Sequence, residues 1–390
     1  MKTMKNIIKC LTASLLVVNL SSCVDLDPEP LSFFAPENTF MDKEGLEALL
    51  ITSRKQIKWE WFGDAFNAGY CETPLVYEYA WSDISVMGAP EVKEIHNLET
   101  QLTPTTNMAL HLRYWDLAWN GIKYANTLIS RVPKSNIDNE DDKNQLLAEG
   151  YFHRAYWYYL LVNQWGDVPL LLEEVTGPKL DFYSTSRMKI LQQMKTDMEF
   201  AVKWLPKNVQ PGCVSRAAGE HLLAKIYLCT GDFQFAVDAT TRCINDYGLH
   251  LMKERFGVNA SDASLDVFND LFQEDNISAS ENKEAIFVVQ ERYGIEGNVA
   301  PKGSARMRNF VPYWCNGAAV KTPDGKQGTT YDAGPYEGYE WVEKLGRGIA
   351  KIRPTNYSQY AIWGKCGNII ARLPKVVVKN ISGSLLSGHL

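Results

Sequence analysis

The sequence predicts a fold dominated by α-helices, in which paired helices form a scaffold and long loops with little β-structure lie over it. Three observations support this prediction. Apolar residues recur at the spacing of amphipathic helices between about residues 41 and 250. Short turns that contain glycine separate successive helical segments. Beyond residue 251, Gly, Pro, Asn and aromatic residues replace the helical periodicity.

The segment from Asp141 to Trp165 predicts the central helix. Its second half is apolar around most of its circumference, with Arg154 as its main charged interruption, so we expect neighbouring helices on several sides. Gly166 supplies the left-handed residue that ends a helix, and Pro169 prevents the helix from resuming. The aromatic residues of this helix are predicted to lie in the core and not in a cofactor site.

Five further helices are predicted from the same periodicity, over residues 41–59, 105–131, 184–204, 214–229 and 233–246. The second of these forms an antiparallel pair with the central helix, and the last two form another pair. Small residues such as Ala224 and Ala236 allow the last two helices to cross closely around Gly231. Such pairs resemble tetratricopeptide repeats.

The first 40 residues predict export and membrane attachment. Three lysines precede an apolar run from Leu11 to Leu20, which is shorter than the roughly 20 residues that span a bilayer. We therefore expect a lipoprotein signal peptide over residues 1–22. The Leu-Ser-Ser-Cys sequence ending at Cys23 is typical of a bacterial lipobox and predicts lipidation of that cysteine. An ordinary signal peptide is the alternative. Residues 23–40 form an acidic, proline-rich tether.

Composition and motifs argue against several classes of function. The formal net charge is −6, so nucleic-acid phosphates would be repelled over most of the surface. The sequence contains no histidine or cysteine spacing typical of a metal site, no phosphate-binding loop and no nucleophile elbow. We therefore expect a binding protein without a cofactor and without enzymatic activity. A glycoside hydrolase remains an alternative, because its two carboxylates are set by space and not by sequence.

The irregular stretch over residues 59–92 is a candidate ligand-binding region. It combines several Gly and Pro residues with eight aromatic residues, and long irregular stretches of compact domains often carry function. Aromatic side chains in loops are suited to stacking against sugars and other ligands. Packing within the loop is the alternative for any single residue.

Five segments, in the expected order, resemble the SusD/RagB family of nutrient-binding outer-membrane lipoproteins of Bacteroidetes. They are the lipobox at Cys23, WDLAWNGIKYAN from Trp115, RAYWYY…WGDVPL from Arg154, RAA…LAKIYL…GDF…A from Arg216, and EAIFVVQ from Glu284. The last segment is also the only clear strand-like run in the sequence. The resemblance implies a lipid-anchored protein of the outer membrane, exposed at the cell surface, with helices similar to tetratricopeptide repeats.

The resemblance also implies a function. Such a protein would cap a SusC-like TonB-dependent transporter and capture an oligo- or polysaccharide for import, whereas members of the RagB branch would capture a peptide. Within the family, the ligand face combines aromatic residues from the N-terminal and C-terminal loops. No motif of the family fixes these residues position by position, and we expect stacking contacts from Trp61, Tyr79, Trp81, Tyr313, Trp314 and Trp341.

The resemblance divides the chain into a helical region over residues 41–250 and a loop-rich region over residues 251–390. In the family, a further helix similar to RLAEVYLIYAEA completes the scaffold. Residues from Ile370 to Pro374 begin like that helix, and the sequence then departs from it. We therefore expect a truncation or frameshift after Pro374, with a short family member as the alternative.

Overall fold

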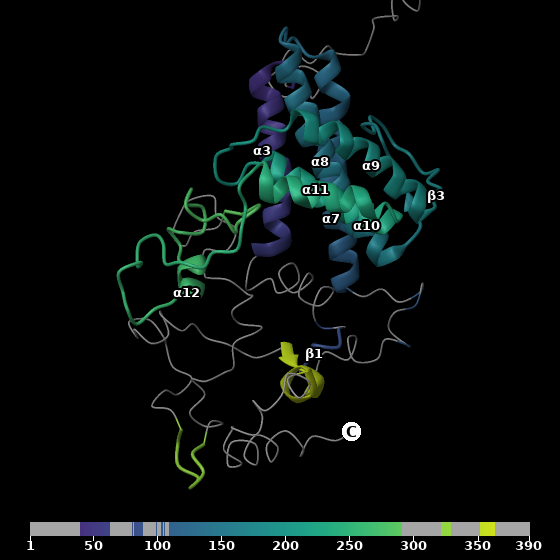
Figure 1. Cartoon of the computed structure of the whole chain (residues 1–390). Helices are drawn as coiled ribbons and strands as arrows, with labels where there is room; N and C mark the ends of the chain where they lie inside the picture. The colour runs from purple at the N-terminus through teal and green to yellow at the C-terminus, as the bar shows by residue number, and fades with distance from the viewer. Residues whose placement is uncertain are drawn as a thin grey trace, which may run out of the picture.

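The computed structural model describes residues 40–62, 80, 82–88, 99, 103, 105, 109–290, 321–328 and 352–362. Within these residues the main body is a stack of long helices (Figure 1). These are α3 (Lys43–Phe62), α7 (Ala109–Arg131), α8 (Glu140–Trp165), α9 (Arg187–Trp204), α10 (Arg216–Thr230) and α11 (Phe233–Asn245). The predicted helix-dominated fold with little β-structure is confirmed, and α7–α8 and α10–α11 form the two expected pairs.

The remaining elements are short. The 3₁₀-helix η2 (Val132–Lys134) links α7 to α8, α12 (Val267–Phe272) lies away from the helical body, and a π-helical turn, η3, spans Tyr357–Ala361. Two small antiparallel sheets pair β1 (Ser85–Met87) with β4 (Ile352–Pro354), and β2 (Val168–Pro169) with β3 (Ser184–Thr185).

Local sequence fixes where the central helices begin and end. The Asn139 side chain accepts hydrogen bonds from the first free amides of α8, and three acidic residues occupy its first turn. Gly166 ends this helix with a φ of 74°. The Ser215 hydroxyl caps α10 in the same way, and Gly231 ends it in the left-handed conformation, with a φ of 83°. The predicted glycine stop signals are therefore confirmed.

One predicted element is wrong. Residues from Glu284 to Gln290 were expected to form a strand, but they run irregularly along the helical body. Phe287 packs against Phe152 of α8, with ring centroids 6.0 Å apart. None of the strands in the described residues pairs with this segment. Its apolar side chains therefore serve to cover helices and not to fill a sheet.

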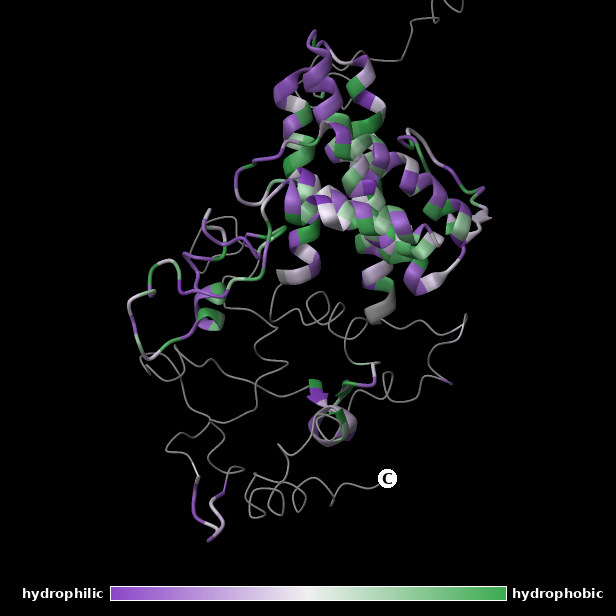
Figure 2. Cartoon of the chain, in the orientation of Figure 1, coloured by the Kyte–Doolittle hydropathy of each residue, from purple (hydrophilic) through white to green (hydrophobic). Residues whose placement is uncertain are grey.

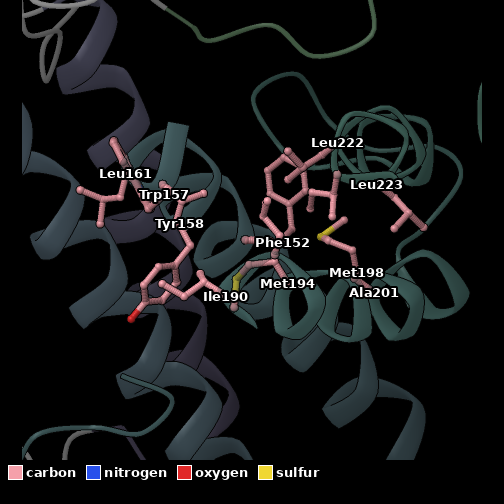
Figure 3. Close-up of a cluster of buried hydrophobic side chains, with 14 of the residues drawn as sticks. Phe152, Trp157, Tyr158, Leu161, Ile190, Met194, Met198, Ala201, Leu222 and Leu223 are labelled. Atoms are coloured by element: carbon pink, nitrogen blue, oxygen red, sulfur yellow. The ribbon is translucent and has the colours of Figure 1, made fainter. Parts of the chain in front are cut away.

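The hydrophobic core surrounds α8. Trp157, Tyr158 and Leu161 of this helix are fully buried, and α9 and α10 present apolar side chains to the same cluster (Figure 3). The facing residues include Ile190, Met194, Met198, Leu222 and Leu223. Burying a side chain of this size contributes about 1.5–3 kcal/mol, so this cluster is the main source of stability.

A charged residue also lies in this core. The side chain of Arg154 is only 4% exposed, and its Nε donates to Asp197 Oδ2 of α9 at 2.8 Å. The guanidinium also donates to the Leu172 carbonyl at 2.8 Å and to Asn126 Oδ1 of α7 at 3.1 Å. Burial raises the pKa of Asp197, and the Arg154 charge opposes that shift. The network fixes α7, α8 and α9 against one another.

No helix in the described part of the chain is both long enough and apolar enough to cross a bilayer. Figure 2 shows hydrophilic and hydrophobic residues interspersed along the helices of the body. This is the pattern of helices that bury one face and expose another.

The loop between α11 and residue 284 is organised by Arg255. Its guanidinium donates to both carboxylate oxygens of Asp270 and to the carbonyl oxygens of Asp262 and Leu265. The Asp270 side chain is fully buried, and the hydrogen bond from Arg255 is the main cause that lowers its pKa. Asn276 joins the network by donating to the Asp270 carbonyl at 3.0 Å. The loop therefore has a defined internal structure despite its lack of regular elements.

The close crossing of α7 and α8 gives a first prediction. A Cβ atom at Gly121 would overlap the indole ring of Trp157. We expect Gly121→Ala to lower the free energy of unfolding by about 1–3 kcal/mol, as overpacked cores do, although alanine favours the helix itself. Urea denaturation measures the change.

Gly177→Ala is the matched control, because nothing lies within 4 Å of the Cβ position there. It is expected to leave stability unchanged or to raise it by up to about 1 kcal/mol. A Gly121→Ala variant as stable as the parent would show that the two helices separate without cost.

The Arg255 network gives a second prediction. The Asp270 carboxylate also accepts from the Phe256 amide at 3.1 Å. Asp270→Asn removes the charge that meets the guanidinium, so amides near Phe256 are expected to exchange hydrogen at least about tenfold faster. Asp266→Asn is the control, because asparagine caps α12 as well as aspartate does. Equal exchange in both variants would contradict the organising role of Asp270.

The ion pair of Arg255 with Asp270 makes the stability of the loop depend on pH. The folded pKa of Asp270 lies below its unfolded value, so its contribution to stability is complete above the unfolded pKa. That contribution is lost as the pH falls through the lowered pKa of the folded state. Hydrogen exchange near Phe256 should therefore accelerate on acidification in the parent and less so in Asp270→Asn.

Candidate functional site

A groove of about 1320 Å³ lies between the helical body and the irregular segment over residues 271–290. We call it the scaffold groove. The end of α3, one face of α8 and one face of α10 form its helical wall, and the irregular segment forms the opposite wall. Its volume is above the range of about 300–1,000 Å³ that is typical of pockets for small ligands, so it has room for a larger one.

Aromatic side chains form the apolar part of the groove. Trp61 of α3 and Tyr156 of α8 are partly exposed there, beside Phe152 and Phe287. The Phe152 and Tyr156 rings are stacked with their centroids 6.4 Å apart. These rings come from three separate parts of the chain and meet only in the folded protein.

Hydrogen bonds hold the two exposed rings in place. The Tyr156 hydroxyl donates to Glu60 Oε2 at 2.6 Å, and Trp61 Nε1 lies 3.4 Å from the same hydroxyl. The Glu60 carboxylate is buried and also accepts from the hydroxyl of Tyr114. Because the rings are fixed before any ligand arrives, binding to them costs little side-chain entropy.

Polar groups line the remainder of the groove. His221 and Lys225 lie one turn apart on α10, and Glu284 and Gln290 belong to the irregular segment. Burial, followed by the neighbouring Lys225 charge, lowers the pKa of His221. Its imidazole is therefore neutral at pH 7 and offers one hydrogen-bond donor and one acceptor.

The opposite wall is held by its own hydrogen bonds. Glu284 Oε2 accepts from the Met252 amide at 2.9 Å, and Gln290 Nε2 donates to Ser278 Oγ at 2.8 Å. Asn282 donates to the carbonyl of Asn276, which belongs to the Arg255 network. The loop network therefore supports the wall of the groove.

Of the predicted stacking residues, Trp61 lies on the groove wall. The other five and the predicted lipidation site fall outside the described residues: Tyr79, Trp81, Tyr313, Trp314, Trp341 and Cys23. Their roles stay predictions. Within the described residues, no group of three or more His, Cys, Asp or Glu side chains is placed to hold a metal ion.

Several groove residues were missed by the sequence analysis. Tyr156 was assigned to the core with the other aromatic residues of its helix, but its ring is half-buried and faces the groove. Phe152 is buried and yet forms part of the same wall. The only sequence signal for His221 and Lys225 is their four-residue spacing on one face of a helix.

The groove combines flat apolar rings with hydrogen-bonding groups at its edge. Ligand sites commonly have this composition, in which apolar contacts supply affinity and a few polar groups set orientation. A sugar ring meets both requirements, because its C–H face is apolar and its hydroxyl groups need separate polar partners.

Comparison with known proteins finds similarity to SusD-like proteins. Residues 72–228 match the profile SusD-like_3, described as "Starch-binding associating with outer membrane". SusD-like protein P2 of Formosa agariphila is 29% identical over 240 residues, which cover 60% of this chain and 46% of that protein. The chain thus spans about half the length of this relative.

Solved structures share the fold at low sequence identity. A SusD-like protein from Bacteroides fragilis is 18% identical with a TM-score of 0.55, and the match covers 72% of this chain and 50% of that one. A SusD superfamily protein from Bacteroides vulgatus is 20% identical with a TM-score of 0.53, covering 64% and 50%.

Surface glycan-binding protein A from Bacteroides thetaiotaomicron, solved in complex with laminarihexaose, is 17% identical, with a TM-score of 0.51 and coverage of 64% and 50%. Each of these structures matches this chain over half of its own length. The profile and the Formosa relative show that part of this chain is similar to SusD-like proteins, and the solved structures share its fold.

Proposed function

We propose that this chain is a cell-surface lipoprotein that captures an oligo- or polysaccharide and delivers it to a SusC-like TonB-dependent transporter of the outer membrane. The observation that carries the proposal is the scaffold groove, in which Trp61 and Tyr156 present fixed aromatic rings beside polar groups. A helical scaffold of the SusD type surrounds this groove.

The chemistry of the groove supports a carbohydrate ligand. Partly exposed Trp and Tyr rings accept the apolar face of a sugar, and neutral His221 with Gln290 offers partners for hydroxyl groups. The Tyr156 ring is held by Glu60 and the Trp61 ring by the Tyr156 hydroxyl, so neither ring needs to rearrange on binding.

Relatives support the same class of ligand. The family profile carries the description "Starch-binding associating with outer membrane", and surface glycan-binding protein A of similar fold was solved with laminarihexaose. We extend carbohydrate binding to this chain on that basis and on the composition of the groove.

The remaining parts of the proposal follow the family. Cys23 would carry the lipid anchor after removal of residues 1–22, and residues 23–40 would act as a tether. The helical region over residues 41–250 and the region over residues 251–390 would together present the ligand face. We propose that Tyr79, Trp81, Tyr313, Trp314 and Trp341 add stacking contacts to those of Trp61.

Binding of the purified full chain to a panel of polysaccharides tests the proposal. Saturable binding is expected without release of sugar from the polysaccharide. Trp61→Ala should weaken the binding at least about tenfold, or about 1.4 kcal/mol, as loss of a central Trp contact does. Isothermal titration measures the affinity, and circular dichroism verifies the helical fold.

Tyr183→Ala is the matched control, because this aromatic side chain is 81% exposed and lies outside the groove. Its affinity should equal that of the parent. Trp81→Ala and Trp314→Ala test the loop contacts, and each is expected to weaken binding with the fold intact. Reducing ends released from a polysaccharide would instead identify a glycoside hydrolase. A folded chain that binds peptides and ignores every glycan would identify a RagB-type peptide-binding protein.

A further inference from the structure

We propose that the scaffold groove takes an acidic glycan, with a carboxylate or sulfate group of the sugar bound by Lys225 while a sugar ring contacts the aromatic wall. This inference rests on the proposed glycan-binding function and specifies its substrate class. It concerns one charged side chain on α10 and its surroundings.

Lys225 is an exposed residue on the groove wall. In the part of the chain that the structure describes, no carboxylate oxygen lies within 4 Å of its ammonium group and no acceptor forms a hydrogen bond with it. Some other lysines of the helical body are paired, as in Lys43 with Asp142 and Lys195 with Asp232, at 2.9 and 3.0 Å. The ammonium group of Lys225 therefore has three donors available to a ligand.

None of the described carboxylates on the groove lining forms an ion pair with Lys225. Glu284 accepts the Met252 amide, and Glu274 and Asp275, which are exposed, interact with other groups. Among the described residues of the lining, the basic side chains are His221 and Lys225; His221 is neutral at pH 7, so Lys225 carries the positive charge of the helical wall. An anionic group that enters the groove gains a charge-assisted hydrogen bond there without breaking an existing ion pair.

The position of Lys225 suits a sugar with an acidic substituent. Lys225 and His221 share one face of α10, whereas Tyr156 and Phe152 belong to α8, and both helices line the same groove. A ring stacked on the aromatic residues would place its substituents toward α10. The flexible four-carbon stem of lysine then lets the ammonium group reach an acid group whose distance from the ring varies.

Attraction of this kind matters in a protein of negative charge. The chain has 46 acidic and 40 basic side chains, so most of its surface repels acidic polysaccharides. The lining also carries Glu274, Asp275 and Glu284, so the attraction for an acid group is confined to the immediate surroundings of the Lys225 ammonium group. A neutral glycan would accept hydrogen bonds from Lys225 through its hydroxyl groups but would lack the attraction between opposite charges.

The test compares acidic oligosaccharides with their neutral counterparts. Isothermal titration of the full chain would use oligogalacturonate against its carboxyl-reduced form, and carrageenan oligosaccharide against its desulfated form. We expect at least one acidic member to bind about tenfold more tightly than its counterpart, with a difference that shrinks as salt is added. The two pairs distinguish a carboxylate from a sulfate group.

Two variants assign the effect to the groove. Lys225→Met should abolish the difference between acidic and neutral members, because it keeps the length of the side chain without the charge. Lys189→Met removes another exposed lysine, which belongs to α9 and lies outside the groove, and should preserve the difference. Circular dichroism checks that both variants fold.

The remaining outcomes overturn the inference in distinguishable ways. Equal affinity for acidic and neutral members, or a preference that survives in Lys225→Met, would contradict the role of Lys225 and leave glycan capture standing. Absence of binding to every glycan, acidic or neutral, would contradict the proposed function as well.

Discussion

The burial of the Arg154 guanidinium constrains the assembly of the helical body. A buried charge costs several kcal/mol unless its donors find acceptors, so the surrounding groups must be in place when the core closes. Asp197 on α9, Asn126 on α7 and the Leu172 carbonyl meet this requirement. Apolar contacts tolerate sliding of one helix along another, whereas this network tolerates one register. The groove walls formed by α8 and α10 depend on that register.

Most of the fold could be predicted because helical periodicity is a local signal. The spacing of apolar residues and the glycines after α8 and α10 located the helices to within a few residues. Arg154 was visible as the charge that interrupts an apolar helix, but its partner Asp197 lies 43 residues further along the chain. Periodicity assigns faces to helices and does not say which faces meet. The partner therefore became known only from the structure.

The errors share one physical cause. An apolar run such as EAIFVVQ fits a buried strand and a segment that covers a helix equally well, and only a pairing strand separates the two. Tyr156 presents the same ambiguity, because an aromatic residue on an apolar helix is buried or half-buried according to what lies opposite. Here the opposite wall comes from residues 271–290, more than 100 residues later. Trp61 was predicted because it lies at the edge of an irregular, aromatic-rich stretch.

Two adjacent residues of α8 have different roles: Trp157 stabilises the core and Tyr156 faces the groove. Trp157 packs against Gly121 of α7, whereas the Tyr156 ring stands nearly perpendicular to it, with centroids 5.2 Å apart, and faces the groove. The packing that immobilises Trp157 therefore also fixes the orientation of Tyr156, and Glu60 secures its hydroxyl. Since the entropy of ordering this ring is lost during folding, it is not lost again when a ligand binds. The rigid helices thus increase the affinity of the groove for a ligand, although they form only one of its two walls.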